Sequence, residues 1–205
     1  MQSKKGIQPM ANHVISTIEI EQGNDAAHKV LADYCERIDA LNKGDTNCFE
    51  LWEDTQALYD ANDWSTLMDE IGAKWAHIFD YEETCIQFES AWGYPMGAIQ
   101  RIVDDIVAAD DKAIVSMYYE DEMPNFIGAV VYAKDYDEAL HIDEEDYPQH
   151  GLKFWWDEEE EGCEEPEDFE ATWDEGWEIR EKFVSEDVKW INDELFPERD
   201  EEEGA

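Results

Sequence analysis

Basic residues are scarce in this sequence of 205 residues, which holds 14 Lys and Arg against 55 Asp and Glu. The resulting net charge of -41 creates a negative field that repels phosphate backbones and anionic lipids. Direct binding of nucleic acid or of a membrane surface is therefore excluded as a function. We expect the partner to be a basic protein that binds or processes DNA.

Cysteine is scarce as well, and none of the four cysteines, Cys35, Cys48, Cys85 and Cys163, has C-x-x-C spacing. This pattern indicates neither a zinc site nor a disulfide framework, so we interpret them as reduced thiols. No apolar run approaches the ~20 residues of a membrane span. These absences predict a cytoplasmic protein, in the cytoplasm of the host cell if the chain is viral.

Catalytic fingerprints are missing too. The five histidines lack H-E-x-x-H spacing, and the sequence holds no G-x-S-x-G, Walker or dinucleotide motif. The run from His141 to Asp146 could hold a divalent ion, but it lacks the pattern of a calcium loop, so a solvated edge strand is favoured. We therefore predict no enzyme, no catalytic residue, no metal and no cofactor.

The chain does contain material for a hydrophobic core, with 43% hydrophobic residues and nine tryptophans. A disordered acidic chain would be poor in such residues. Alternation and helical spacing predict mixed helices and strands, with Pro95 opening the central helix. The expected strands are 14–20, 74–81, 84–92, 113–119, 126–134 and 141–146, and the expected helices are 27–41, 49–67, 96–107 and a long one from 167 onward.

Tryptophans next to expected strands invite a functional interpretation. Lys74-Trp75 and Ala91-Trp92 resemble parts of an aromatic recognition site, yet such tryptophans more often belong to the core, and we treat both as structural. The aromatic run Phe154-Trp155-Trp156 cannot face inward along its whole length, because successive side chains of a strand point to opposite faces. Trp155 and Trp156 are therefore candidate aromatic anchors for a partner.

Acidic residues concentrate toward the C-terminus, where residues 135–205 hold 30 acids and 5 bases and so carry -25 of the charge. The helix expected from Glu167 is amphipathic, with Gly176 as its weak point and Pro197 as its end. Its acidic row and the preceding acidic run are the candidate phosphate-mimicking, partner-binding residues. They are Asp157, Glu158, Glu159, Glu160, Glu161, Glu170, Asp174, Glu178 and Glu181.

Several short motifs occur in a characteristic order along residues 10–135. They are Ala11-Asn12-His13-Val14, Gly72-Ala73-Lys74-Trp75-Ala76, Phe88-Glu89-Ser90-Ala91-Trp92-Gly93-Tyr94-Pro95, and Tyr118-Tyr119-Glu120 through Phe126-Ile127-Gly128. This series resembles the YubB-type ferredoxin-like family of plasmid and phage accessory proteins. The resemblance implies a ferredoxin-like sheet and an origin in a phage or plasmid, and it supplies no catalytic residue. Ile71, Ala73 and Gly93-Tyr94 depart from the family pattern.

These observations combine into one hypothesis. The fold is expected to be α+β, a ferredoxin-like antiparallel sheet with packed helices and an acidic C-terminal helical extension. Residues 1–9 are expected to be a leader or disordered, residues 10–150 the ferredoxin-like domain, and residues 151–205 the acidic, aromatic-rich extension packed on it.

The function we predict is that of a DNA mimic that inhibits a restriction, nuclease, recombination or transcription protein of the host. The alternative function is that of a non-enzymatic, structural and self-assembling accessory protein whose charge serves solubility. Formation of a homodimer is compatible with either function.

Overall fold

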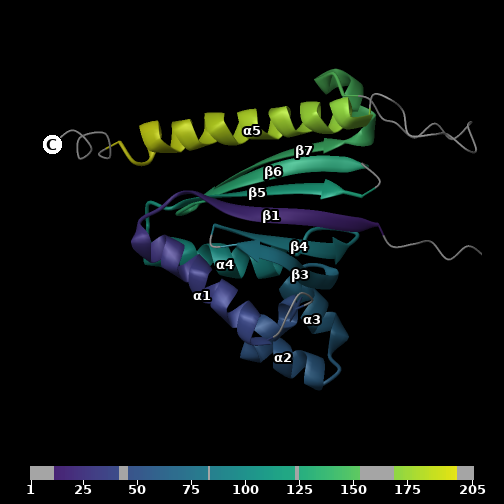
Figure 1. The fold of residues 1–205 in the computed structure, drawn as a ribbon, viewed down its shortest axis with the longest axis vertical. Helices are drawn as coiled ribbons and strands as arrows, with labels where there is room; N and C mark the ends of the chain where they lie inside the picture. The colour runs from purple at the N-terminus through teal and green to yellow at the C-terminus, as the bar shows by residue number, and fades with distance from the viewer. Residues whose placement is uncertain (1–11, 42–45, 83, 123–124, 153–168, 198–205) are drawn as a thin grey trace, which may run out of the picture.

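The computed structural model describes residues 12–41, 46–82, 84–122, 125–152 and 169–197, and in the last range it describes side chains from residue 174 onward. Its centre is a seven-stranded sheet in the order β2-β3-β4-β1-β5-β6-β7, with every neighbouring pair antiparallel (Figure 1). The strands are β1 (His13–Gln22), β2 (Thr46–Asn47), β3 (Lys74–Glu82), β4 (Cys85–Ala91), β5 (Ile114–Asp121), β6 (Phe126–Ala133) and β7 (Tyr136–Asp143).

Helices pack on both faces of this sheet. The α-helices are α1 (Asp25–Leu41), α2 (Glu53–Asp60), α3 (Trp64–Ile71), α4 (Met96–Ala109) and α5 (Phe169–Glu194), and the 3-10 helices are η1 (Cys48–Leu51) and η2 (Glu144–His150). In Figure 1, α5 runs along the β5–β7 half of the sheet, whereas α1 to α4 lie toward β1, β4 and β3.

Two layers of core follow from the alternation of side chains along the strands. Val115 and Met117 of β5 are buried in the cluster that α1 and α4 cover. Ile114 and Tyr118 of the same strand point to the other face, where they pack with Val184 of α5. The long C-terminal helix thus forms a third layer, on the face opposite α1 and α4.

The predicted α+β class and antiparallel sheet are confirmed, but the sheet is larger than a simple ferredoxin-like one. The segment β1-α1-β3-β4-α4-β5 places its four strands in the order β3-β4-β1-β5. β2 is added at one edge, and β6 and β7 are added at the other. The two added strands on the β5 side provide the surface on which α5 packs.

The edge strand expected at His141 to Asp146 begins earlier in the structure. β7 starts at Tyr136, because Lys134 and Asp135 make a two-residue turn directly after β6, and Asp135 adopts a left-handed φ of 57° there. The residues after Asp143 form η2 instead of continuing the strand. The prediction was therefore correct about an edge strand and wrong about its bounds.

The single helical stretch expected at residues 49–67 is divided into η1, α2 and α3. Trp52 interrupts it with an extended backbone, and Asn62 interrupts it again with a left-handed φ of 59°. Asp63 then caps α3 by accepting hydrogen bonds from the backbone amide and the hydroxyl group of Thr66. The prediction of one continuous helix was wrong because these capping residues favour a new start.

Close contacts fix α3 against α4. A Cβ atom at Gly97 would lie 2.0 Å from the carbonyl oxygen of Glu70, so only glycine permits this approach. Arg101 of α4 donates hydrogen bonds to Glu70 Oε2 at 2.6 Å and to Asp54 Oδ2 at 2.9 Å. The position of α2 and α3 relative to the sheet is therefore well defined.

Candidate functional site

The inner face of α5 attaches this helix to the sheet. Val184 and Ile191 are buried against β5 and β6. Arg180 is also buried, and its guanidinium group donates hydrogen bonds to the Tyr119 carbonyl oxygen at 3.2 Å and to Glu120 Oε2 at 3.0 Å. A base in the middle of this acidic helix therefore points away from solvent.

Gly176 lies on the same inner face and does not break the helix. A Cβ atom at this position would lie 3.0 Å from Ile127 Cδ1 of β6, so the glycine permits a close approach of helix and sheet. In the sequence, Gly176 is the weak point of the expected helix, where the helix could break. That interpretation was wrong, because α5 continues through it to Glu194.

The outer face of α5 carries the predicted acidic row. Asp174, Glu178 and Glu181 are exposed to solvent, as are Glu175 and Glu186 of the same helix. With a rise of 1.5 Å per residue, Asp174 and Glu178 lie about 6 Å apart along the helix axis. The first three described turns of α5 therefore present these carboxylates and Lys182 outward, while Arg180 faces inward.

Other predicted site residues are only partly covered by the structure. Glu170 belongs to α5, but its side chain is not among those described. The run Asp157 to Glu161 and the candidate anchors Trp155 and Trp156 lie outside the described residues. The structure therefore brings together Asp174, Glu178 and Glu181 on one face of α5. The partner-binding role of the other predicted residues stays a prediction.

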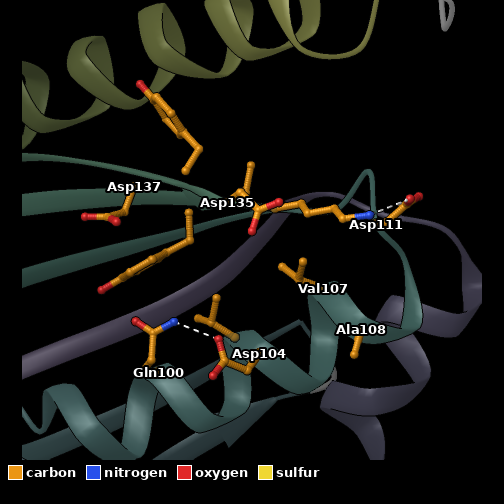
Figure 2. A pocket seen from close by; sticks show the side chains of 12 residues that line it. Gln100, Asp104, Val107, Ala108, Asp111, Asp135 and Asp137 are labelled. Atoms are coloured by element: carbon orange, nitrogen blue, oxygen red, sulfur yellow. Dashed lines mark hydrogen bonds and ion pairs between the residues drawn. The ribbon is translucent and has the colours of Figure 1, made fainter.

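A second acidic surface lies between α4 and the turn that joins β6 to β7. The pocket at this surface has a volume of about 540 Å³. Figure 2 shows Asp104 on its α4 side, Asp135 and Asp137 on the opposite side, and Asp111 at one end. Lys134 donates a hydrogen bond to Asp111 at 3.1 Å, which compensates part of this charge. No local sequence pattern predicts this pocket, since it joins segments about 30 residues apart.

The sheet face left uncovered beside α5 carries a cluster of two histidines and one carboxylate. Glu89 of β4 lies between His13 of β1 and His77 of β3, with His77 Nε2 at 3.3 Å and a shorter contact to His13 Nδ1. Burial raises the pKa of the Glu89 carboxyl, but hydrogen bonds from both histidines lower it by more, so the pKa lies below its ordinary value. The pairing of β1 and β3 with β4 creates this cluster, and no sequence spacing reveals it.

Trp75 and Trp92 are not core residues. Their side chains are 60% and 57% exposed, and both have left-handed backbones, with φ of 53° and 72°. Bulky side chains rarely adopt such a conformation, because the Cβ atom meets the backbone. The structural interpretation of these two tryptophans was therefore wrong.

The described residues also bear on metal binding and on membrane insertion. In the described ranges, no three His, Cys, Asp or Glu side chains are grouped so that they could hold a metal ion. Among the helices described, none has both the length and the apolar character needed to cross a membrane.

Comparison with known proteins gives no relative. No protein-family model, curated protein or solved structure matches this chain. The resemblance of residues 10–135 to the YubB-type family stays a prediction, and the function has to be argued from the surface itself.

Proposed function

We propose that this chain is an acidic DNA mimic, encoded by a phage or plasmid, which binds and inhibits a DNA-binding or DNA-processing protein in the host cytoplasm. The observation that supports it best is the separation of charge on α5. Asp174, Glu178 and Glu181 face solvent, whereas Arg180 is 2% exposed and paired with Glu120 beneath them. Arg180, the base within the row, is thus withheld from the outer face of the helix, and the exposed base Lys182 at the end of the row lies 3.9 Å from Glu186.

The spacing of these carboxylates suits the role. Successive acidic residues about one helical turn apart lie about 6 Å from each other along the axis, comparable to the separation of successive phosphates on a DNA strand. A basic cleft that holds a phosphate backbone would accept such a row. Inhibition would be competitive, with association accelerated by the charge of -41. The mechanism requires no catalytic residue and no cofactor.

We also infer that the unit formed by β1, α1, β3, β4, α4 and β5 is a ferredoxin-like core. The strand order β3-β4-β1-β5 and the two helices on one face support this interpretation. In this view β2, β6, β7 and α5 are additions, and the additions on the β5 side carry the acidic surface.

A competition assay tests the proposed function. A labelled DNA duplex is bound in turn to a basic restriction endonuclease, nuclease, recombinase and transcription factor, and the chain is then titrated in. We expect it to release the duplex from at least one of them without forming a ternary complex, and to lose potency as salt rises. Retention of the duplex by every member of the panel at low salt would contradict the proposal.

The rival function is self-assembly as a structural accessory protein. It is favoured by Trp177 and Trp190 of α5, which are 40% and 44% exposed and could be covered by a second copy. Light scattering separates the two functions. A monomer that displaces DNA supports mimicry, whereas a dimer or larger assembly that leaves DNA bound supports the rival.

A further inference from the structure

We propose that a groove between α2, α3 and β3 binds a basic amphipathic helix of the partner protein. The groove has a volume of about 530 Å³, and its apolar walls include Phe49, Tyr59, Trp64, Leu67, Met68 and Trp75. We call it the aromatic groove. The inference rests on the proposed function for the basic character of the partner, and it adds an apolar helical face to what the partner must present.

The apolar side chains of the aromatic groove are exposed together. Tyr59, Trp64, Met68 and Trp75 are 39%, 51%, 43% and 60% exposed, and all four line this one groove. Clustered apolar exposure of this kind marks an interaction surface, and aromatic residues are typical binding hot spots. A highly charged chain gains nothing for its own solubility from such a patch, so a partner that covers it is the physical reason for its presence.

The walls of the aromatic groove are already ordered. The rings of Phe49 and Tyr59 stack with their centroids 4.3 Å apart, and Tyr59 contacts Trp64 edge to face at 5.2 Å. Side chains that are held in place lose less conformational entropy when a partner binds. Trp75 lines the groove from β3 and has a left-handed backbone with φ of 53°, a strained conformation for a bulky residue.

The pattern along α3 indicates that the missing partner is a helix. Trp64, Leu67, Met68 and Ile71 follow the spacing i, i+3, i+4 and i+7, which is the stripe that one helix presents to another. Leu67 and Ile71 are buried within the chain, whereas Trp64 and Met68 extend the stripe outward and are left uncovered. A second apolar stripe could therefore pack against the outer half of α3.

Charge complementarity indicates that this helix is basic. Residues 46–73, which form the α2 and α3 side of the groove, contain no Lys, Arg or His and seven acidic residues, two of which pair with Arg101 of α4. Asp60, Asp63 and Asp69 are exposed and directly neighbour Tyr59, Trp64 and Met68 in the sequence. On the β3 side, the Nζ atom of Lys74 lies 4.1 Å from the centroid of the Trp75 ring. Among the described residues that line the groove itself, Lys74 is the one that carries a charge. The exposed carboxylates of α2 and α3 would attract Lys and Arg, and the aromatic lining would select for apolar side chains between them.

Two synthetic peptides of identical composition test the inference. Each has about 20 residues of Leu, Lys and Ala; in the first the leucines form one helical face, and in the second they are spread around the helix. Fluorescence anisotropy measures the affinity of each peptide for the chain at about 0.15 M salt, where surface charges are screened beyond about 8 Å. We expect the first peptide to bind the chain about tenfold more tightly than the second. The comparison cancels net charge, so it reports on the contribution of the apolar helical face.

Matched variants assign this preference to the aromatic groove. Trp75→Ala should reduce the preference severalfold, whereas Trp92→Ala should leave it unchanged, although Trp92 has nearly the same exposure and also a left-handed backbone. The double variant Trp64→Ala with Met68→Ala should remove it, and urea unfolding verifies that each variant is folded. Equal binding of the two peptides by the unaltered chain, or a preference that survives the double variant, would overturn the inference.

Self-association is a separate outcome of the same experiment. If light scattering finds a dimer that the double variant dissociates, a second copy occupies the groove and the inference is overturned. Failure of the proposed function would look different, because DNA would stay bound to the panel proteins while the preference between the two peptides could persist.

Discussion

Arg180→Met tests how α5 is held on the sheet. Methionine keeps an apolar stem of similar length but removes the hydrogen bonds from the guanidinium group to Glu120 and to the Tyr119 carbonyl oxygen. Removing one partner of a buried ion pair costs about 3–5 kcal/mol. The Glu120 side chain is 30% exposed and water can solvate it in the variant, so we expect a loss of about 2–3 kcal/mol in the free energy of unfolding.

Lys182→Met is the matched control, since it changes the net charge of the same helix equally. Lys182 is 75% exposed and lies 3.9 Å from Glu186, so its loss should cost about 0–0.5 kcal/mol. Urea unfolding followed by tryptophan fluorescence measures both variants against the unaltered chain. Equal effects of the two substitutions would refute the conclusion that Arg180 is a buried anchor beneath an acidic surface.

Three further results are expected. Gly128→Ala should destabilise the fold by about 1–3 kcal/mol, because a Cβ atom would lie 2.2 Å from the ring of Tyr119, and an unchanged urea midpoint would contradict this. Because the pKa of Glu89 is lower in the folded chain than in the unfolded chain, its ionised carboxylate stabilises the fold at pH values above the unfolded-state pKa, and this stability is lost as pH falls through the folded-state pKa. The free energy of unfolding of Glu89→Gln should therefore depend less on pH below about pH 5, and an acid-unfolding profile identical to that of the unaltered chain would contradict this role of Glu89. The melting temperature should rise from low to moderate salt, since the net charge of -41 is screened, and a salt-independent value would show that the carboxylates are already compensated.

Periodicity predicted most of the secondary structure. The alternation in residues 14–20 became β1, the hairpin at Glu82 became β3 and β4, and the helix after Pro95 became α4. These segments were predictable because burial of one face decides their conformation. Residues 49–67 were not, because Trp52 and Asn62 interrupt a pattern that is otherwise helical.

The surfaces were less predictable than the elements. The exposed row Asp174, Glu178 and Glu181 follows directly from helical spacing, so the sequence sufficed for it. The exposure of Trp75 does not follow from spacing, because a register shift between Lys74 and His77 in β3 accompanies its left-handed backbone. Contacts that depend on strand pairing or on backbone irregularity leave no local pattern in the sequence.

The most direct test of DNA mimicry is the affinity of two charge variants for the DNA-binding protein that the competition assay identifies. One variant neutralises the outer face of α5 with Asp174→Asn, Glu178→Gln and Glu181→Gln. The other makes an equal charge change on α1 with Asp33→Asn, Glu36→Gln and Asp39→Asn, at residues that are also exposed.

Isothermal titration at several salt concentrations gives the affinity and its salt dependence for both. We predict that the α5 variant loses most of its affinity and salt dependence, with unfolding stability unchanged or slightly higher as like-charge repulsion is relieved, while the α1 variant binds almost as the unaltered chain does. Equal affinities of the two variants, or an α5 variant that still displaces DNA, would contradict the proposal that these carboxylates stand in for phosphates.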